Sequence, residues 1–289
     1  MSWGGPLVRY ATAPPLAVAA WRVAFSALLI AAIVVMRDRG ATVRSLSGRD
    51  WVAAVASGLF LAAHFWSWIA SLSYTTVASS VVLVSTQPIF VAVLSVLFLG
   101  ERPQRAQWLG IGVAVAGAVV IGWGDFAGGP EPLLGDLLAV AGAVFVSFYY
   151  VIGRRLRQRM DLWSYTGVVY GVAATVLLVA SAGHPGVAVF DHPGTDWLVF
   201  LALAAGPMMV GHTGVNYALR YVRAYVANLA LLGEPIGATL LAWWLPGIEE
   251  RPSSQLLAGG ALILAGIALG VSVGRNPAAE RPDRPWRKE

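Results

Sequence analysis

The sequence predicts an all-α integral membrane protein, a ten-helix bundle made of two inverted five-helix repeats. Three observations lead to this prediction: an apolar composition, a long internal repeat, and basic residues concentrated in alternate loops. Of the 289 residues, 57% are hydrophobic and 12% are charged, and the mean hydropathy is +0.68. A soluble domain carries about a quarter of its residues as charged side chains, so this composition excludes one.

Apolar runs long enough to cross a bilayer, about 18 residues or more, occur nine times in the chain. These runs cover residues 16–36, 51–72, 75–99, 106–124, 133–153, 162–181, 196–218, 222–245 and 255–274. A short segment, residues 1–12, precedes them and aligns with the end of the run that begins at residue 133. We interpret residues 1–12 as the last third of a first helix, shortened by a mis-set start codon or by a real truncation.

The two halves of the chain repeat each other. Residues 74–90, YTTVASSVVLVSTQPIF, align with residues 221–237, YVRAYVANLALLGEPIG, and each copy later ends in Glu-Arg-Pro, at 101–103 and 250–252. A repeat of this length in an apolar chain indicates a duplicated membrane bundle. We expect a first repeat over residues 1–126, a second repeat over residues 127–274, and a basic tail over residues 275–289.

Basic residues gather on one side of the predicted bundle. Of the 20 Lys and Arg residues, only Arg9, Arg22 and Arg251 lie outside the tail and the loops that follow the second, fourth, sixth and eighth helices. The positive-inside rule therefore places these loops and the C-terminus in the cytoplasm. Because each repeat has five helices, the second repeat enters the membrane with the opposite orientation. Inverted repeats are typical of secondary transporters, whose substrate site lies near the midplane between the halves.

Composition also limits the chemistry. The chain has no cysteine, which excludes disulfides, thiol catalysis and cysteine-ligated metal. The net charge of +5 does not indicate nucleic-acid binding, because the basic residues lie in loops between apolar runs. No phosphate-binding loop and no His-x-x-x-His or Glu-x-x-His pattern occurs, so we expect neither direct ATP use, nor a metal, nor another cofactor.

Two of the predicted helices contain proline at matching positions. Pro88 follows Gln87 in the first repeat, and Pro235 follows Glu234 in the second. Proline has no backbone N–H and leaves a carbonyl in the preceding turn without its donor. A pair of interrupted helices in corresponding positions is the usual mark of a transporter site. We interpret Glu234 as a group that binds a cation or a proton; the alternative is a buried, neutral acid that accepts hydrogen bonds from a neighbouring helix.

Two histidines lie inside apolar runs. His64 shares a helical face with Ser67 and Trp68, and His212 shares one with Asn216. These side chains predict a mixed aromatic and polar cavity between pseudo-symmetric helices. The alternative is hydrogen bonding between helices, which contributes about 0.6–2 kcal/mol per contact. Weaker candidates for the cavity wall are Tyr149, Tyr150 and Asn228.

Arg22 is the one basic residue well inside a predicted span. It lies about 10 Å from the start of its helix, at 1.5 Å per residue. Our main interpretation is that its long side chain extends to the outer interface, as arginines near helix ends do. Anion binding or pairing with an acid is the alternative.

The runs at 106–124 and 255–274 are rich in small residues. Close packing between helices explains such residues without any chemistry. They also allow a homodimer through these two helices, the fifth and the tenth. The small residues are Gly110, Gly112, Ala116, Gly117, Gly259, Gly260, Ala265, Gly266 and Gly270.

The segments AAHFWSWIASLSYTTVASSVVLVSTQPIF at 62–90 and GHTGVNYALRYVRAYVANLALLGEPIGATLLAWW at 211–244 resemble one branch of the EamA family, in the drug/metabolite transporter superfamily. The resemblance covers nearly the whole chain apart from the first helix. It implies ten helices, both termini in the cytoplasm, location in a plasma membrane such as the bacterial inner membrane, and usually efflux of small metabolites or drugs. It does not name the substrate, since the family handles amino acids, nucleobases, sugars and lipophilic cations.

The prediction is therefore a secondary transporter that works by alternating access and exports a small molecule, with proton coupling as a further hypothesis. A membrane-embedded enzyme is the first alternative. The only cluster that suggests one is His184, Asp191 and His192, and its Gly- and Pro-rich setting is typical of a turn. A sensor that transports nothing is the second alternative.

Overall fold

The computed structural model describes residues 1–38, 40–75, 77–122, 130–246 and 254–272, and within these ranges the regular secondary structure is entirely helical. The elements are α1 (Gly4–Val8), α2 (Pro15–Asp38), α3 (Ala41–Arg44), α4 (Gly48–Ser71), α5 (Val77–Val84), α6 (Gln87–Leu99), α7 (Arg105–Gly122), α8 (Pro132–Leu156), α9 (Leu162–Gly183), α10 (Gly194–Leu203), η1 (Ala204–His212), α11 (Thr213–Ala218), α12 (Ala224–Leu229), η2 (Ala230–Gly233), α13 (Glu234–Trp244) and α14 (Ser254–Ser272). The all-α prediction is confirmed for these residues, and the described part of each predicted apolar run forms a helix or a succession of helices.

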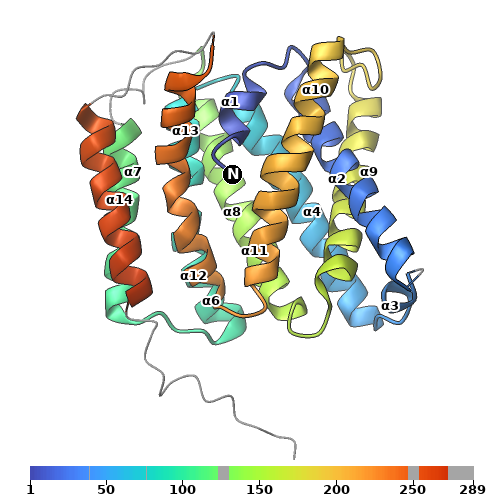
Figure 1. Ribbon diagram of the computed structural model, residues 1–289, viewed down its shortest axis with the longest axis horizontal. Helices are drawn as coiled ribbons and strands as arrows, with labels where there is room; N and C mark the ends of the chain where they lie inside the picture. The colour runs from blue at the N-terminus through green and yellow to red at the C-terminus, as the bar shows by residue number, and fades with distance from the viewer. Residues whose placement is uncertain (39, 76, 123–129, 247–253, 273–289) are drawn as a thin grey trace, which may run out of the picture.

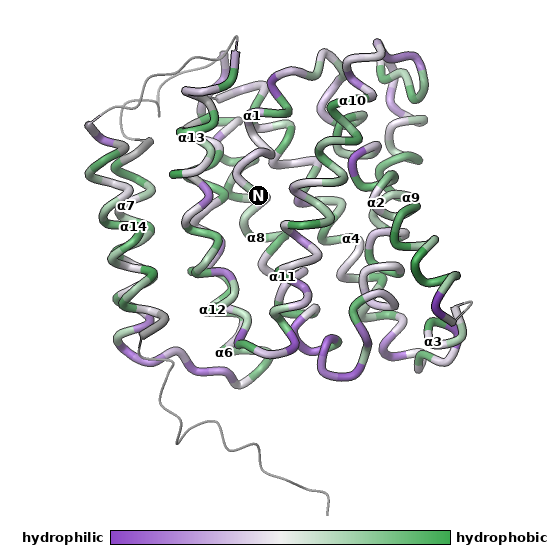
Figure 2. The backbone as a smooth tube through the Cα atoms, in the orientation of Figure 1, coloured by the Kyte–Doolittle hydropathy of each residue, from purple (hydrophilic) through white to green (hydrophobic). Residues whose placement is uncertain are grey.

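Six helical segments of the described chain are long and apolar enough to cross a membrane. They are Pro15–Arg37, Gly48–Ser71, Ser79–Leu99, Pro132–Leu156, Leu162–Gly183 and Gly194–Ala218. Two shorter apolar helices, Arg105–Val120 and Leu257–Gly270, lie beside them. Hydrophobic residues dominate the middle of the bundle and hydrophilic residues collect at its ends, as expected for a protein embedded in a bilayer (Figure 2).

The helices stand side by side in one bundle (Figure 1). The pair α7 and α14 forms one edge, while α2, α3 and α9 form the other. Between these edges α4 packs on α8 and α9, and α6 packs on α8 and α12. The N-terminal segment forms α1, which contacts α10 and α13, and the N-terminus itself lies within the bundle.

Small residues bring α7 and α14 together. A Cβ atom placed on Gly117 would lie 2.5 Å from the carbonyl oxygen of Gly259, and one on Gly110 would lie 2.7 Å from that of Gly266. No side chain fits at such distances, so the glycines allow the two backbones to touch. The predicted close packing is confirmed. A homodimer through these helices stays a prediction, and it would use faces other than this seam.

Both spans that contain the matched prolines are interrupted just before the proline. The first is divided between α5 and α6, and the second passes from α12 through the 3₁₀ turn η2 into α13. Gln87 and Glu234 each begin the second piece, and Pro88 and Pro235 each follow in its first turn. Proline is tolerated there because the first backbone N–H groups of a helix have no partner within it. The predicted proline interruptions are confirmed.

At the basic end of the bundle, the N-terminus of α9 is capped by an acidic side chain. Asp161 caps the N-terminus of α9, and its Oδ1 accepts hydrogen bonds from the backbone N–H groups of Trp163 and Ser164 at 3.0 and 3.3 Å. The Nη1 atom of Arg37 lies 3.2 Å from the same oxygen. Burial raises the pKa of Asp161, but these hydrogen bonds and the charge of Arg37 outweigh it and leave the pKa below its ordinary value.

Candidate functional site

A small cavity lies in the middle of the bundle, between the broken spans. Its volume is about 30 Å³, which holds a water molecule or two but no metabolite. The walls are contributed by α1, α2, α4, the α5–α6 break, η1 and α13. The lining residues are Met1, Gly4, Arg22, His64, Trp68, Val84, Ser85, Gln87, Pro207, His212 and Glu234. The structure therefore brings together five residues that the sequence marked for this site: His64, Trp68, Gln87, His212 and Glu234.

The two histidines face each other across the bundle, with ring centroids 6.1 Å apart. The Nδ1 atom of His64 lies 2.9 Å from the carbonyl oxygen of Gly142. A carbonyl only accepts, so this nitrogen donates. The ring of His64 is also parallel to that of Trp68, at 6.2 Å and 3°. His212 is stacked on Tyr150, whose hydroxyl lies 3.3 Å from its Nδ1. Both rings are thus fixed by one partner and a neighbouring aromatic ring.

Arg22 does not extend to the outer interface, and the main interpretation of its position is wrong. The side chain is 1% exposed, and its guanidinium carbon lies 4.3 Å from the ring centre of Phe65 and 5.8 Å from that of Trp68. The attraction between a cation and an aromatic face holds the charge inside the bundle. Within the described residues its Nε and Nη1 atoms have no hydrogen-bond partner. Glu234 lines the same cavity, so its carboxyl group lies near the guanidinium.

The other candidates are not among the residues that line the cavity: Ser67, Tyr149, Tyr150, Asn216 and Asn228. Ser67 donates its hydroxyl to the carbonyl of Ala63 in its own helix, at 2.7 Å. Asn228 likewise donates to the carbonyl of Ala224 at 3.0 Å. Asn216 donates its amide to the hydroxyl of Tyr149. These contacts are hydrogen bonds within and between helices, the alternative that the sequence left open.

A polar layer separates the cavity from the basic end of the bundle. Tyr170 and Thr213 share a hydrogen bond of 3.0 Å, and Asn216 lies one turn further along α11. These side chains are buried, and so are the tyrosines of α8 beside them. None of these buried side chains is among the residues that line the cavity.

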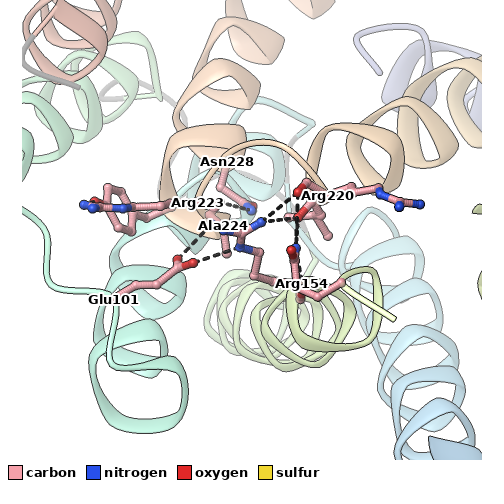
Figure 3. Close-up of polar contacts among 9 residues, drawn as sticks. Glu101, Arg154, Arg220, Arg223, Ala224 and Asn228 are labelled. Carbon is pink, nitrogen blue, oxygen red and sulfur yellow. Dashed lines mark hydrogen bonds and ion pairs between the residues drawn. The ribbon is translucent and has the colours of Figure 1, made fainter. Parts of the chain in front are cut away.

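Below this layer a network of charged and backbone groups joins the helix ends (Figure 3). The Nε atom of Arg154 donates to Oε1 of Glu101 at 2.8 Å, and its Nη1 donates to the carbonyl of Leu219 at 2.7 Å. The other carboxylate oxygen of Glu101 accepts from the backbone N–H of Ala224 at 3.2 Å. The two charged side chains are only 15% and 18% exposed. The network ties the end of α6 to α8, α11 and α12, and we call it the basic-end network.

Sequence reasoning missed two parts of this arrangement. The sequence places Arg154 among the basic loop residues and Glu101 in the Glu-Arg-Pro triplet that ends the repeated segment. Neither pattern predicts that the two side chains form an ion pair. Pro207 was not singled out, yet it lies within the π-helix η1 and lines the cavity. A π-helix in a long span is a frequent sign of a functional site, and the proline in an apolar run was the available signal.

His184 and His192, the two histidines of the loop between α9 and α10 that suggested an enzyme, contact different residues. His184 pairs through Nδ1 with the carbonyl of Pro185 at 2.8 Å. The ring of His192 packs edge-on against Trp197 and Phe200. Among the described residues no group of three His, Asp or Glu side chains could hold a metal ion.

Comparison with known proteins gives consistent matches over most of the chain. The model of the EamA-like transporter family matches residues 2–123 and 133–272. An uncharacterized transporter of Archaeoglobus fulgidus is 28% identical over 81% of this chain and 78% of its own. A probable terminal-alkyne amino-acid exporter of Streptantibioticus cattleyicolor is 32% identical over 70% of this chain and 67% of its own. The uncharacterized inner membrane transporter YedA of Escherichia coli is 28% identical over 87% of this chain and 80% of its own. A solved crystal structure with 25% identity superimposes with a TM-score of 0.75 and covers 95% of both chains.

Proposed function

This chain belongs to the EamA-like transporter family, and we propose that it is a secondary transporter that moves a small molecule across the plasma membrane by alternating access. One observation carries the proposal. Arg22, His64, His212 and Glu234 surround one cavity in the middle of an apolar bundle. Ionisable groups at this depth are costly unless they pair with each other or serve a solute, so a cluster of four supports a solute pathway through this cavity.

The broken helices around the cavity support a moving site. Gln87 and Glu234 each begin a helix after a break, at matching positions of the two repeats, and η1 adds a third irregular segment. Discontinuous helices of this kind surround the substrate sites of carriers built from inverted repeats. We propose that the chain has this architecture, ten helices in two inverted repeats, and that the breaks are where the helices bend during transport.

The closed state of the structure fits one stage of such a cycle. A cavity of about 30 Å³ is too small for a metabolite, and the basic-end network and the polar layer lie between it and one side of the bundle. Transport then requires two alternating openings. On one side of the membrane the hydrogen bonds of the basic-end network break, and on the other side the helices around Met1 and Gly4 move apart. We propose that the basic end is cytoplasmic, because of its arginines.

Export is the proposed direction, with support from the relative named as a probable terminal-alkyne amino-acid exporter. The relative named as an inner membrane transporter supports the proposed location. We propose proton coupling through Glu234, which would bind either a proton or a cationic group of the substrate. Competition between the two at one carboxylate links the movement of a proton to that of the solute.

The proposal is tested in two stages. A thermal-shift screen over amino acids, nucleobases and cationic drugs first names a ligand. Its uptake is then measured in proteoliposomes with and without a pH gradient, for the wild-type protein and for Glu234→Gln. The control Glu131→Gln removes an exposed acid at the start of α8. We expect wild type and the control to respond to the gradient and Glu234→Gln to lose the response. Uptake no faster than in protein-free vesicles would refute transport, whereas unchanged pH dependence would refute only the role of Glu234.

A further inference from the structure

A second and larger cavity lies at the basic end, between α4, α6 and α8. Its volume is about 500 Å³. It opens towards the outside of the bundle, because neighbouring side chains on the outer faces of α4 and α6 are exposed: Leu59 by 48%, Leu97 by 68% and Phe98 by 60%. In a membrane these faces contact lipid. The cavity is therefore a slot reached from the bilayer, and it is distinct from the central cavity.

The inner part of the slot is aromatic and aliphatic. Phe60 of α4 is stacked on Phe148 of α8, with centroids 4.7 Å apart and planes at 12°. Phe98 of α6 lies 6.4 Å from Phe148. With Val151 and Ile152 these rings form a wall that has no hydrogen-bonding group. Such a wall accepts a hydrocarbon chain and does not orient a polar solute.

The mouth of the slot is charged, with three arginines and one aspartate. Asp50 is already neutralised, because its Oδ1 lies 3.6 Å from Nη1 of Arg159 and its Oδ2 accepts from the hydroxyl of Ser47 at 2.7 Å. Arg49 and Arg155 line the same mouth, and among the described residues neither has an ion pair or a side-chain hydrogen bond. Two uncompensated positive charges thus lie above an apolar wall.

We propose that this slot binds one anionic phospholipid of the surrounding bilayer, with an acyl chain against the three phenylalanine rings and the phosphate near Arg49 and Arg155. Two features identify the occupant: the positive charge of the arginines, which complements a phosphate, and the depth of the slot's mouth in the membrane. Helix ends on the basic side of a membrane protein lie at the level of lipid headgroups, and the cytoplasmic leaflet is the one that carries anionic lipid.

A second outer groove of the molecule gives an internal contrast. It measures about 570 Å³ and lies between α2, α3 and α9, at the same end of the bundle. Its wall is similarly apolar, but among the residues that the structure describes Arg44 is the only charged one in the lining. Size and apolar character are therefore common to both grooves, and the pair of free arginines distinguishes the slot. Any bilayer lipid fits the second groove, whereas the slot favours a negative headgroup.

The test measures lipid binding to the full-length protein in detergent by native mass spectrometry and by the shift of the unfolding temperature. The probes are phosphatidylglycerol, phosphatidylcholine with the same chains, and glycerol phosphate as the headgroup alone. The test variant is Arg49→Gln with Arg155→Gln. Each basic residue near a headgroup strengthens binding by a factor of about 5, so we expect the double variant to bind phosphatidylglycerol about 30-fold more weakly.

Two matched variants complete the design. Arg105→Gln with Arg220→Gln removes the same charge from exposed positions outside the slot, and it should bind phosphatidylglycerol like the wild type. Arg49→Lys with Arg155→Lys keeps the charge and should retain most of the binding. The proposal is overturned if the charge-matched control is weakened equally, if phosphatidylcholine binds the wild type as tightly, or if glycerol phosphate alone reproduces the shift. None of these outcomes bears on transport through the central cavity.

Discussion

The basic-end network offers the sharpest prediction about the transport cycle. In Glu101→Gln the amide keeps one acceptor oxygen, but its NH₂ group faces a donor, either the guanidinium of Arg154 or the backbone N–H of Ala224. One of the two hydrogen bonds is therefore lost together with the ionic charge. A hydrogen bond to a charged group contributes about 1.5–3 kcal/mol. Because the pair is 15% and 18% exposed, we take a value near 2 kcal/mol.

A loss of about 2 kcal/mol from the closed state alone raises the population open at the basic end by about 30-fold. A cysteine reporter can measure this, since the chain has none of its own. Ser85→Cys places a thiol in the central cavity. In inside-out vesicles we expect an impermeant maleimide to label this thiol about 30-fold faster when Glu101→Gln is also present.

The matched control for this experiment is the ion pair between Asp50 and Arg159 at the same end of the bundle. The side chain of Arg159 is 65% exposed, and exposed pairs contribute between 0 and about 1 kcal/mol. Asp50→Asn should therefore change the labelling rate by a factor of about 5 or less. If Glu101→Gln and wild type are labelled at the same rate, the network does not hold the basic end closed and the reasoning is refuted.

Three further predictions concern other parts of the molecule. Arg22→Gln should lower transport by about tenfold or more. The protein should still fold, because the change removes a buried charge whose Nε and Nη1 atoms have no hydrogen-bond partner among the described residues. Uptake in proteoliposomes measures transport and gel filtration checks folding; uptake equal to that of the wild type would show that transport does not need this charge. Gly117→Ala should lower the unfolding temperature by forcing α7 from α14, at about 1–3 kcal/mol, whereas Gly112→Ala, which meets nothing within 4 Å, should not. The lowered pKa of Asp161 contributes stability that is complete above its unfolded pKa of about 3.9 and is lost as pH falls through the folded pKa. Asp161→Asn should therefore flatten the acid limb of a thermal-unfolding profile between about pH 5 and pH 2, and an unchanged limb would contradict this.

The apolar runs and the two proline breaks could be predicted from the sequence for a physical reason. A bilayer demands long apolar helices, and proline removes a backbone donor wherever it occurs, so both effects are local. Five of the candidates line one cavity, because polar side chains in apolar spans turn towards the interior of a bundle and away from lipid.

The direction of Arg22 and the basic-end network could not be predicted in the same way. Helical periodicity is ambiguous in a span that is apolar all round, so it did not show which face of α2 turns inward. The bond between Arg154 and Glu101 joins residues 53 positions apart, and its backbone acceptors belong to a third segment. Such contacts depend on how helices are arranged, which composition and spacing do not specify.

The central claim is that the solute passes through the cavity between Arg22 and Glu234. The most direct test is to fill this cavity. Val84, at the end of α5, is buried in the wall of this cavity. Val93, in α6 of the same span, is 44% exposed on the outer face of the bundle. With the ligand from the screen, we expect Val84→Trp to abolish both the thermal shift and uptake in proteoliposomes, and Val93→Trp to leave both unchanged. Wild-type uptake by a folded Val84→Trp protein would contradict the claim.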